Sequence, residues 1–192
     1  MEHVVFQVGE FRCDEAGSDS SLHCRYDRGV RGDSCLVLAQ RRAHTPCVGD
    51  FVFRIDFAAL EKLSVAVAQA MPADDYFFRP HPESMTFGEL MSHIAATNYQ
   101  FCAGLKDSEP PALPSPSGKE ATFKFLSDSF EYCSPIIRDL TEPQFAASHN
   151  SPDGNLPGRD VLLAMYIHVA HHRGQAEIYL RDKGIKPPPY RI

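Results

Sequence analysis

The sequence has few basic residues, no long apolar run and no N-terminal leader pattern, and each absence excludes a class of protein. Its 19 Lys and Arg residues are outnumbered by 25 Asp and Glu residues, which give a net charge of −6. This balance argues against a nucleic-acid binder, because such proteins present a basic face to the phosphates. No apolar run reaches the roughly 18 residues of a membrane-spanning helix, and Met1–Phe6 lacks the basic and apolar stretches of a secretory signal. We therefore expect a cytoplasmic protein with no nucleic-acid or membrane partner.

Lysine is absent from residues 1–50, although arginine occurs there six times and lysine usage is ordinary afterwards. This part of the chain has Gly, Ser and Asp clusters and no sustained apolar period, so no secondary structure is predicted for it. It could be a small irregular subdomain, a disordered extension or a translation-start artefact, and the composition favours the last two. Residues 51–192 form the predicted folded domain, whose length fits a single unit.

The six cysteines contain no Cys-x-x-Cys pair. Cys102 and Cys133 lie in helical patterns, where a free cysteine acts as a small core residue. We expect reduced thiols, as in a cytosolic protein. A secreted protein with two N-terminal disulfides and a zinc module of N-terminal cysteines are the alternatives, although the spacing matches no known metal site. The cysteines concerned are Cys13, Cys24, Cys35 and Cys47.

Beyond residue 56, apolar residues recur at intervals of three and four, which predicts four amphipathic helices. We expect these helices at about 57–71, 86–105, 118–140 and 158–183. The loops between them are rich in Pro, Ser, Asn and Gly, and no segment alternates as a strand would. The prediction is an all-α fold, a four-helix bundle preceded by an irregular or disordered N-terminal extension.

Three further signals concern the ends and the continuity of the helices. Ser117 and Glu120 have the spacing of a capping box at the start of the third helix. Pro135 lies inside that helix and should kink it or open a turn. Gly184 is placed to end the fourth helix with a left-handed residue.

The last helix carries three histidines within five residues. His168 and His172 are one turn apart, about 6 Å along the axis and about 40° around it, so both imidazoles can converge on one ion. His171 points about 60° to the other side of His168. On the second helix, His93 flanks the buried stripe, and antiparallel packing would bring it against the pair. Three imidazoles leave open coordination positions, as in a reactive metal site.

A structural interpretation of these histidines remains open. A single histidine at a helix boundary is more often a hydrogen-bonded core or surface residue than a metal ligand. The pair on the last helix could also belong to an exposed face, since Arg173, Glu177 and Arg181 show that this helix has one. Histidine ligands suit Zn, Ni, Cu, Fe and Mn alike, so the spacing does not select the metal.

The segments 78–94 and 168–175, with the tail 179–188, resemble the DinB-like superfamily of damage-inducible metal-binding proteins. The likeness covers about residues 51–192 and none of the first 50. It implies a four-helix bundle, often homodimeric, which holds a divalent metal (Zn, Ni, Mn or Fe) through one histidine of the second helix and two of the fourth. By motif position, the implied ligands are His93, His168 and His172.

The resemblance also implies an activity. Characterised relatives include transferases and isomerases that use a low-molecular-weight thiol, which the metal would convert to a nucleophilic thiolate for attack on a small electrophile. The alternatives are a non-catalytic metal-binding stress-response protein and a metal-dependent hydrolase. A hydrolase would need a nearby carboxylate base, and Glu177 points away from His172. Four side chains are candidates for contacts around the ligands or with an anion: Tyr99, Tyr166, His171 and Arg173.

Overall fold

A computed structural model describes residues 12–14, 23–25 and 48–190. The chain divides into two units, residues 1–43 and 44–192. In the first unit, strand β1 (Arg12–Asp14) pairs antiparallel with β2 (His23–Arg25), and Cys13 lies opposite Cys24. These two short strands correct the expectation of no secondary structure there. Most of the remaining N-terminal extension, with Cys35 and Cys47, lies outside the described residues.

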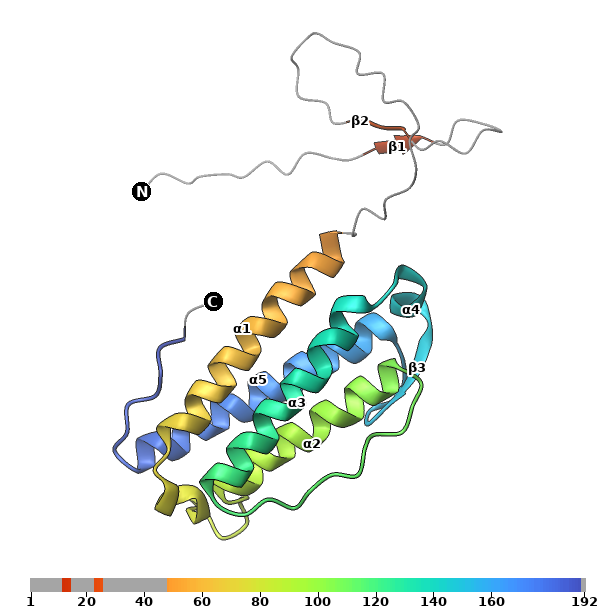
Figure 1. Ribbon diagram of the computed structural model, residues 1–192. Coiled ribbons are helices and arrows are strands. Elements are labelled where there is room, and N and C mark those ends of the chain that lie inside the picture. Colours follow the sequence, from red (N-terminus) through yellow and green to blue (C-terminus); the bar gives the residue numbers. More distant parts are fainter. Residues whose placement is uncertain (1–11, 15–22, 26–47, 191–192) are drawn as a thin grey trace, which may run out of the picture. The chain divides into compact units, whose positions relative to one another are not determined.

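The second unit is a bundle of four long helices, α1 (Val48–Ala70), α2 (Phe87–Leu105), α3 (Lys119–Asp139) and α5 (Gly158–Asp182). Helices α1 and α2 each contact both α3 and α5, and α2 and α5 run in opposite directions (Figure 1). The four predicted helices are therefore confirmed, and the fold is mostly helical. None of the helices in the described part of the chain is long and apolar enough to span a membrane.

The predicted apolar stripes form the core of the bundle. Phe87, Ile94 and Phe101 of α2 and Phe130 and Ile137 of α3 are at most 2% exposed. Burial of each such side chain contributes about 1.5–3 kcal/mol before entropy costs. This packing fixes the rotation of α2 about its axis, and so the direction in which its polar edge faces.

Cys102 and Cys133 correct a second expectation. Both side chains are fully buried, as predicted, but the two sulfur atoms form a disulfide that joins α2 to α3, with the Cα atoms 5.5 Å apart. The spacing of each cysteine within its own helix could predict burial. It could not predict that two core positions on neighbouring helices face each other.

The helix ends match the prediction at one place and differ at another. Gly184 has φ 73° and donates its N–H to Arg181, which ends α5 as expected. The opened turn expected as one alternative at Pro135 is not observed, because helix α3 is continuous through that residue. The capping box predicted for Ser117 and Glu120 is wrong, because the helix begins one residue later, after Gly118 with φ 78°, and Glu120 then stands one position too early to close the box.

Four short elements occupy segments that the sequence analysis treated as connections: η1 (Ala73–Phe77), α4 (Glu142–Ala146), β3 (Ser148–Ser151) and β4 (Gly154–Pro157). The strands β3 and β4 form an antiparallel hairpin, with the turn residue Gly154 at φ 99°. Strands of four residues are too short to give a clear alternating pattern. The hairpin packs against α2 and α5 at the end of the bundle remote from α2's N-terminus.

Candidate metal centre

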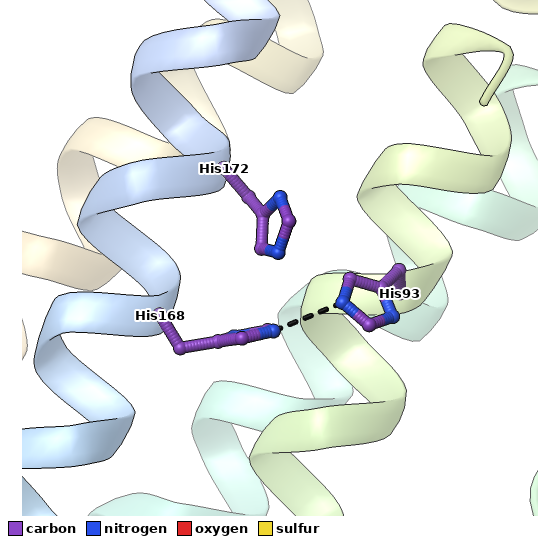
Figure 2. A group of neighbouring side chains, drawn as sticks. All are labelled: His93, His168 and His172. Atoms are coloured by element: carbon purple, nitrogen blue, oxygen red, sulfur yellow. Dashed lines mark hydrogen bonds between the residues drawn. The ribbon is translucent and has the colours of Figure 1, made fainter. Parts of the chain in front are cut away.

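Helices α2 and α5 bring the three predicted histidines together (Figure 2). His93 extends from α2, while His168 and His172 extend from successive turns of α5. One nitrogen from each ring can be chosen so that all three lie within 4.8 Å of one another, and the Nε2 atoms of His93 and His168 are 3.0 Å apart. The ring centroids are separated by 4.5–4.8 Å.

These distances fit a single transition metal. Tetrahedral coordination with metal–nitrogen bonds of about 2.1 Å separates two ligand nitrogens by about 3.4 Å. The observed separations bracket that value, so small ring rotations suffice to reach it. Three protein ligands leave at least one coordination position open, which is the pattern of a catalytic site.

Burial keeps the three imidazoles neutral at pH 7. Burial first, and then the neighbouring His172, His93 and His171, lower the pKa of His168 to about 4. Burial also lowers the pKa of His93 and of His172. A neutral imidazole retains the lone pair that a metal requires. The packing that half-buries these rings therefore favours the form that can bind a cation.

Gln175 orients one of the candidate ligands, His172, and was not among the predicted site residues. Its Oε1 lies 2.8 Å from Nδ1 of His172, so the Nδ1–H donates to it and the lone pair is left on Nε2. Its Nε2 lies 3.1 Å from Nε2 of His171. A glutamine three residues after a histidine on one helix is the signal that could have identified it. By contrast, Nδ1 of His168 is buried without a partner among the described residues.

An open cleft of about 430 Å³ lies beside His172. The cleft is lined by both apolar and polar side chains. The residues that line the cleft, besides His172, are Glu83, Ser84, Met85, Leu90, Gln175, Ile178 and Tyr179. The cleft is large enough for a small organic molecule next to the histidines.

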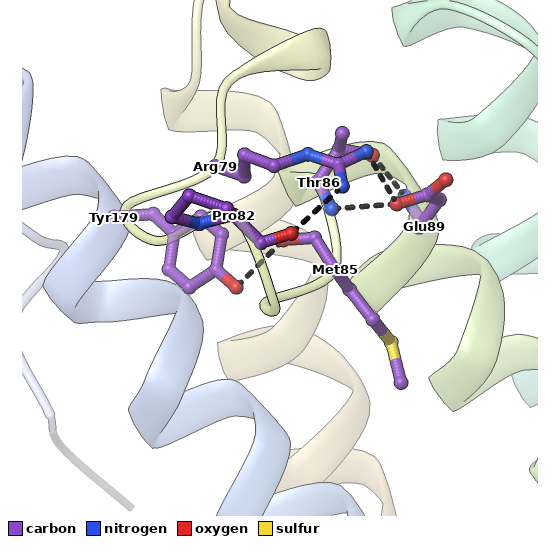
Figure 3. Close-up of polar contacts among 6 residues, drawn as sticks. All are labelled: Arg79, Pro82, Met85, Thr86, Glu89 and Tyr179. Atoms are coloured by element: carbon purple, nitrogen blue, oxygen red, sulfur yellow. Dashed lines mark hydrogen bonds and ion pairs between the residues drawn. The ribbon is translucent and has the colours of Figure 1, made fainter.

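Hydrogen bonds hold the segment before α2 that forms one wall of this cleft (Figure 3). The hydroxyl of Tyr179 donates to the carbonyl of Met85 at 2.9 Å, which ties the segment to α5. Arg79 lies 3.6 Å from the carboxylate of Glu89. Thr86 and Glu89 form a capping box at the start of α2. The wall is therefore anchored to both helices that carry the histidines.

Of the four other candidate residues, three contact other parts of the bundle and His171 lies beside His172. The Tyr99 ring stacks on α3, and Tyr166 faces α1. Arg173 forms an ion pair of 2.9 Å with Glu177 and lies under the Tyr190 ring. His171 is exposed, and its ring centroid is 4.9 Å from that of His172.

A helical bundle with three histidines gathered from two antiparallel helices, beside an open cleft, defines a class of candidate metal-binding proteins. Within that class, the chain belongs to the DinB superfamily, whose family model matches residues 56–176. The family expectation from the sequence is thereby confirmed, and all three expected ligand positions lie within the matched range.

Two relatives support the fold assignment. The uncharacterized protein YjoA of Bacillus subtilis (strain 168) is 25% identical over 141 residues, which cover 70% of this chain and 90% of YjoA. The crystal structure of the DinB-like YjoA matches with a TM-score of 0.63 and 22% identity, over 72% of this chain and 96% of that one. A DinB-like protein from Bacillus cereus ATCC 10987 matches with a TM-score of 0.64 and 15% identity, over 72% and 95%. Both matched structures share the helical bundle.

Proposed function

We propose that His93, His168 and His172 bind one divalent transition metal, Zn, Ni, Mn or Fe. We further propose that the protein is a thiol-dependent transferase or isomerase acting on a small electrophile. The observation that carries this proposal is the convergence of three neutral imidazole nitrogens within 4.8 Å, beside a cleft of about 430 Å³. A purely structural histidine cluster would have no need of an adjoining cleft.

In this proposal the side chains around the histidines and the cleft have different roles. A bound divalent metal would supply a lowered thiol pKa, so that the cosubstrate is a thiolate at neutral pH. The imidazoles are held neutral by burial, and Gln175 fixes the tautomer of His172. Met85 and Ile178 offer an apolar surface to the organic part of the electrophile.

A hydrolase that uses Glu177 as its base is less well supported. The carboxylate considered for it, Glu177, is within 2.9 Å of Arg173 and 3.5 Å of Arg181, so two cations already occupy its oxygens. It does not line the cleft. The Glu177 carboxylate would have to break both ion pairs before it could act as a base at the histidines.

Metal content is the first test. Untagged protein purified without chelator is measured by elemental mass spectrometry beside a variant with His93, His168 and His172 all changed to Ala. We expect about one equivalent of metal, lost in the variant. The matched control is His171→Ala on the same helix, which should retain the metal. Metal retained by the triple variant, or absent from the wild type even after reconstitution, would refute the site.

Activity is the second test. Glutathione and 1-chloro-2,4-dinitrobenzene are mixed with the metal-loaded protein; the sulfur–carbon bond forms, the carbon–chlorine bond breaks and chloride leaves. We expect turnover that requires both thiol and metal and that the triple variant lacks. A rate independent of thiol would refute the transferase. Bound metal without turnover, across a panel of thiols and electrophiles, would favour a non-catalytic metal-binding protein.

A further inference from the structure

A second hollow lies between α1 and α5, and it is named here the α1–α5 hollow. Its volume is about 220 Å³. Aliphatic side chains of both helices, two tyrosine rings and one guanidinium line it, and none of these residues lines the cleft beside His172. The side chains on which the argument depends are Leu60, Leu63, Tyr166, Ala170, Arg173 and Tyr190. Arg173 follows His172 directly, so the two side chains leave α5 about 100° apart.

Arg173 has a donor that the described chain does not use. Its Nη1 donates to Glu177 at 2.9 Å, whereas its Nε is buried without a hydrogen-bond partner among the described residues. Only 12% of the Arg173 side chain is exposed. Buried polar groups in folded proteins are nearly always hydrogen-bonded. Nε and Nη2 form the edge of a guanidinium that can hold both oxygens of a carboxylate, and the bond to Glu177 uses neither of them.

The charges around Arg173 favour an anion. Glu177 is shared between Arg173 and Arg181, at 2.9 and 3.5 Å. Two guanidiniums and one carboxylate leave one positive charge uncompensated in this group. The described residues that line the α1–α5 hollow include no aspartate or glutamate. A second carboxylate would therefore neutralise the group and give the unused Nε–H an acceptor.

Tyr190 determines how such an anion can approach. Its ring lies over the guanidinium of Arg173, with 4.8 Å between the guanidinium carbon and the ring centroid. The N–H groups of a guanidinium point outward in its own plane, so a ring over one face leaves the Nε edge available. Because Tyr190 is itself 61% exposed, the bundle core does not depend on it.

We propose that the α1–α5 hollow binds a small apolar monocarboxylate, with the carboxylate at the Nε edge of Arg173 and the hydrocarbon part against Leu60 and Leu63. A cavity of about 150 Å³ lined by aliphatic side chains can hold benzene. The larger α1–α5 hollow therefore has room for a six-carbon acid such as hexanoate. The apolar wall supplies most of the contact surface, and the charge selects an acid over its amide. This site requires no metal and does not depend on the function proposed above.

Tryptophan fluorescence tests the proposal, because the chain contains no tryptophan. Tyr190→Trp places one in the wall of the hollow and keeps an aromatic ring over Arg173. The full-length variant is freed of metal with a chelator and titrated with hexanoate, hexanamide and acetate. We expect hexanoate to change the emission and to bind at least tenfold more tightly than hexanamide, which lacks the charge, or acetate, which lacks the chain. Calorimetry with hexanoate on the wild type should give the same affinity within threefold.

Further substitutions in the Tyr190→Trp background locate the bound acid. Arg173→Gln removes the cation and Ala170→Phe fills the hollow from its exposed rim, so each should weaken hexanoate binding at least tenfold. Arg173→Lys keeps the charge without the planar edge, and its affinity should lie between those of Arg173→Gln and the parent. The matched control is Arg159→Gln, about 21 Å away along α5, which should bind as the parent does. Circular dichroism checks that each variant is folded.

The remaining outcomes would overturn the proposal. Hexanoate that binds neither the wild type nor the tryptophan variant, or binds no better than hexanamide, would refute an acid site. Binding that survives both Arg173→Gln and Ala170→Phe would place the acid elsewhere. An equal loss in Arg159→Gln would show a general effect of charge. Binding that appears only with metal, and is lost when His93, His168 and His172 are all changed to Ala, would assign the acid to the candidate metal centre instead.

Discussion

Replacing Gln175 with Leu tests whether a residue that touches no metal controls the candidate site. The hydrogen bond from Nδ1 of His172 to Gln175 is 2.8 Å long and accounts for the ligand's tautomer. In the variant, either ring nitrogen of His172 can carry the proton. The tautomer with its lone pair on Nε2 is then no longer favoured by a hydrogen bond at Nδ1. Leu has the size and helix propensity of Gln, so α5 itself should be unaffected.

The size of the effect follows from the bond that is lost. A neutral hydrogen bond contributes about 0.5–1.5 kcal/mol net, which predicts metal binding about three- to tenfold weaker. Competition against a chromogenic chelator measures the affinity, and Gln175→Glu is the conservative variant because it retains an acceptor oxygen. The control is Gln100→Leu, an exposed position on α2 two turns beyond His93. Gln175→Leu with affinity within twofold of the wild type would refute the orienting role.

Three further predictions concern stability. Gly104→Ala should destabilise the fold by about 1–3 kcal/mol, because its Cβ would overlap a backbone carbonyl of β3, whereas Gly174→Ala should stabilise it by about 0.5–1 kcal/mol. Urea denaturation measures both changes in the free energy of unfolding, and changes of the same sign would contradict the difference in packing. Hydrogen bonds from Thr86 lower the pKa of Glu89, so the folded form holds this proton less tightly, and the stability it adds is lost as pH falls below about 4.3; Glu89→Gln should show a smaller drop in melting temperature between pH 5 and 3 than the wild type. His149 is 2% exposed with both ring nitrogens bonded, so His149→Leu should cost about 1–3 kcal/mol in the same urea assay, and an unchanged midpoint would show those bonds to be dispensable.

Much of the fold could be predicted from local pattern. The stripe of α2 and the Gly184 cap depend on residues within a few positions of one another, and both appear as expected. The pair His168 and His172 also depends on spacing within one helix. His93 required one further assumption, antiparallel packing of α2 against α5, which the bundle fulfils.

The remainder depends on contacts between distant segments. The Cys102–Cys133 disulfide joins residues 31 positions apart in the sequence. The hydrogen bond between Tyr179 and Met85 joins residues 94 positions apart. No periodicity within a helix carries information about which face meets which neighbour. Gln175 was missed for a different reason, since an exposed glutamine on a helix is ordinary until its hydrogen-bond partner is known.

Helix α5 has the weakest amphipathic pattern of the four long helices. One side of it forms the core, the adjacent edge carries His168 and His172 half-buried, and the opposite side exposes Leu163 and Ile167. Apolar residues on the exposed side and histidines near the buried side both blur the amphipathic period that identifies a helix face. Local rules are broken in this way where a surface serves something other than the fold of the single chain. The half-buried histidines are such a departure, and the metal binding proposed above would account for them.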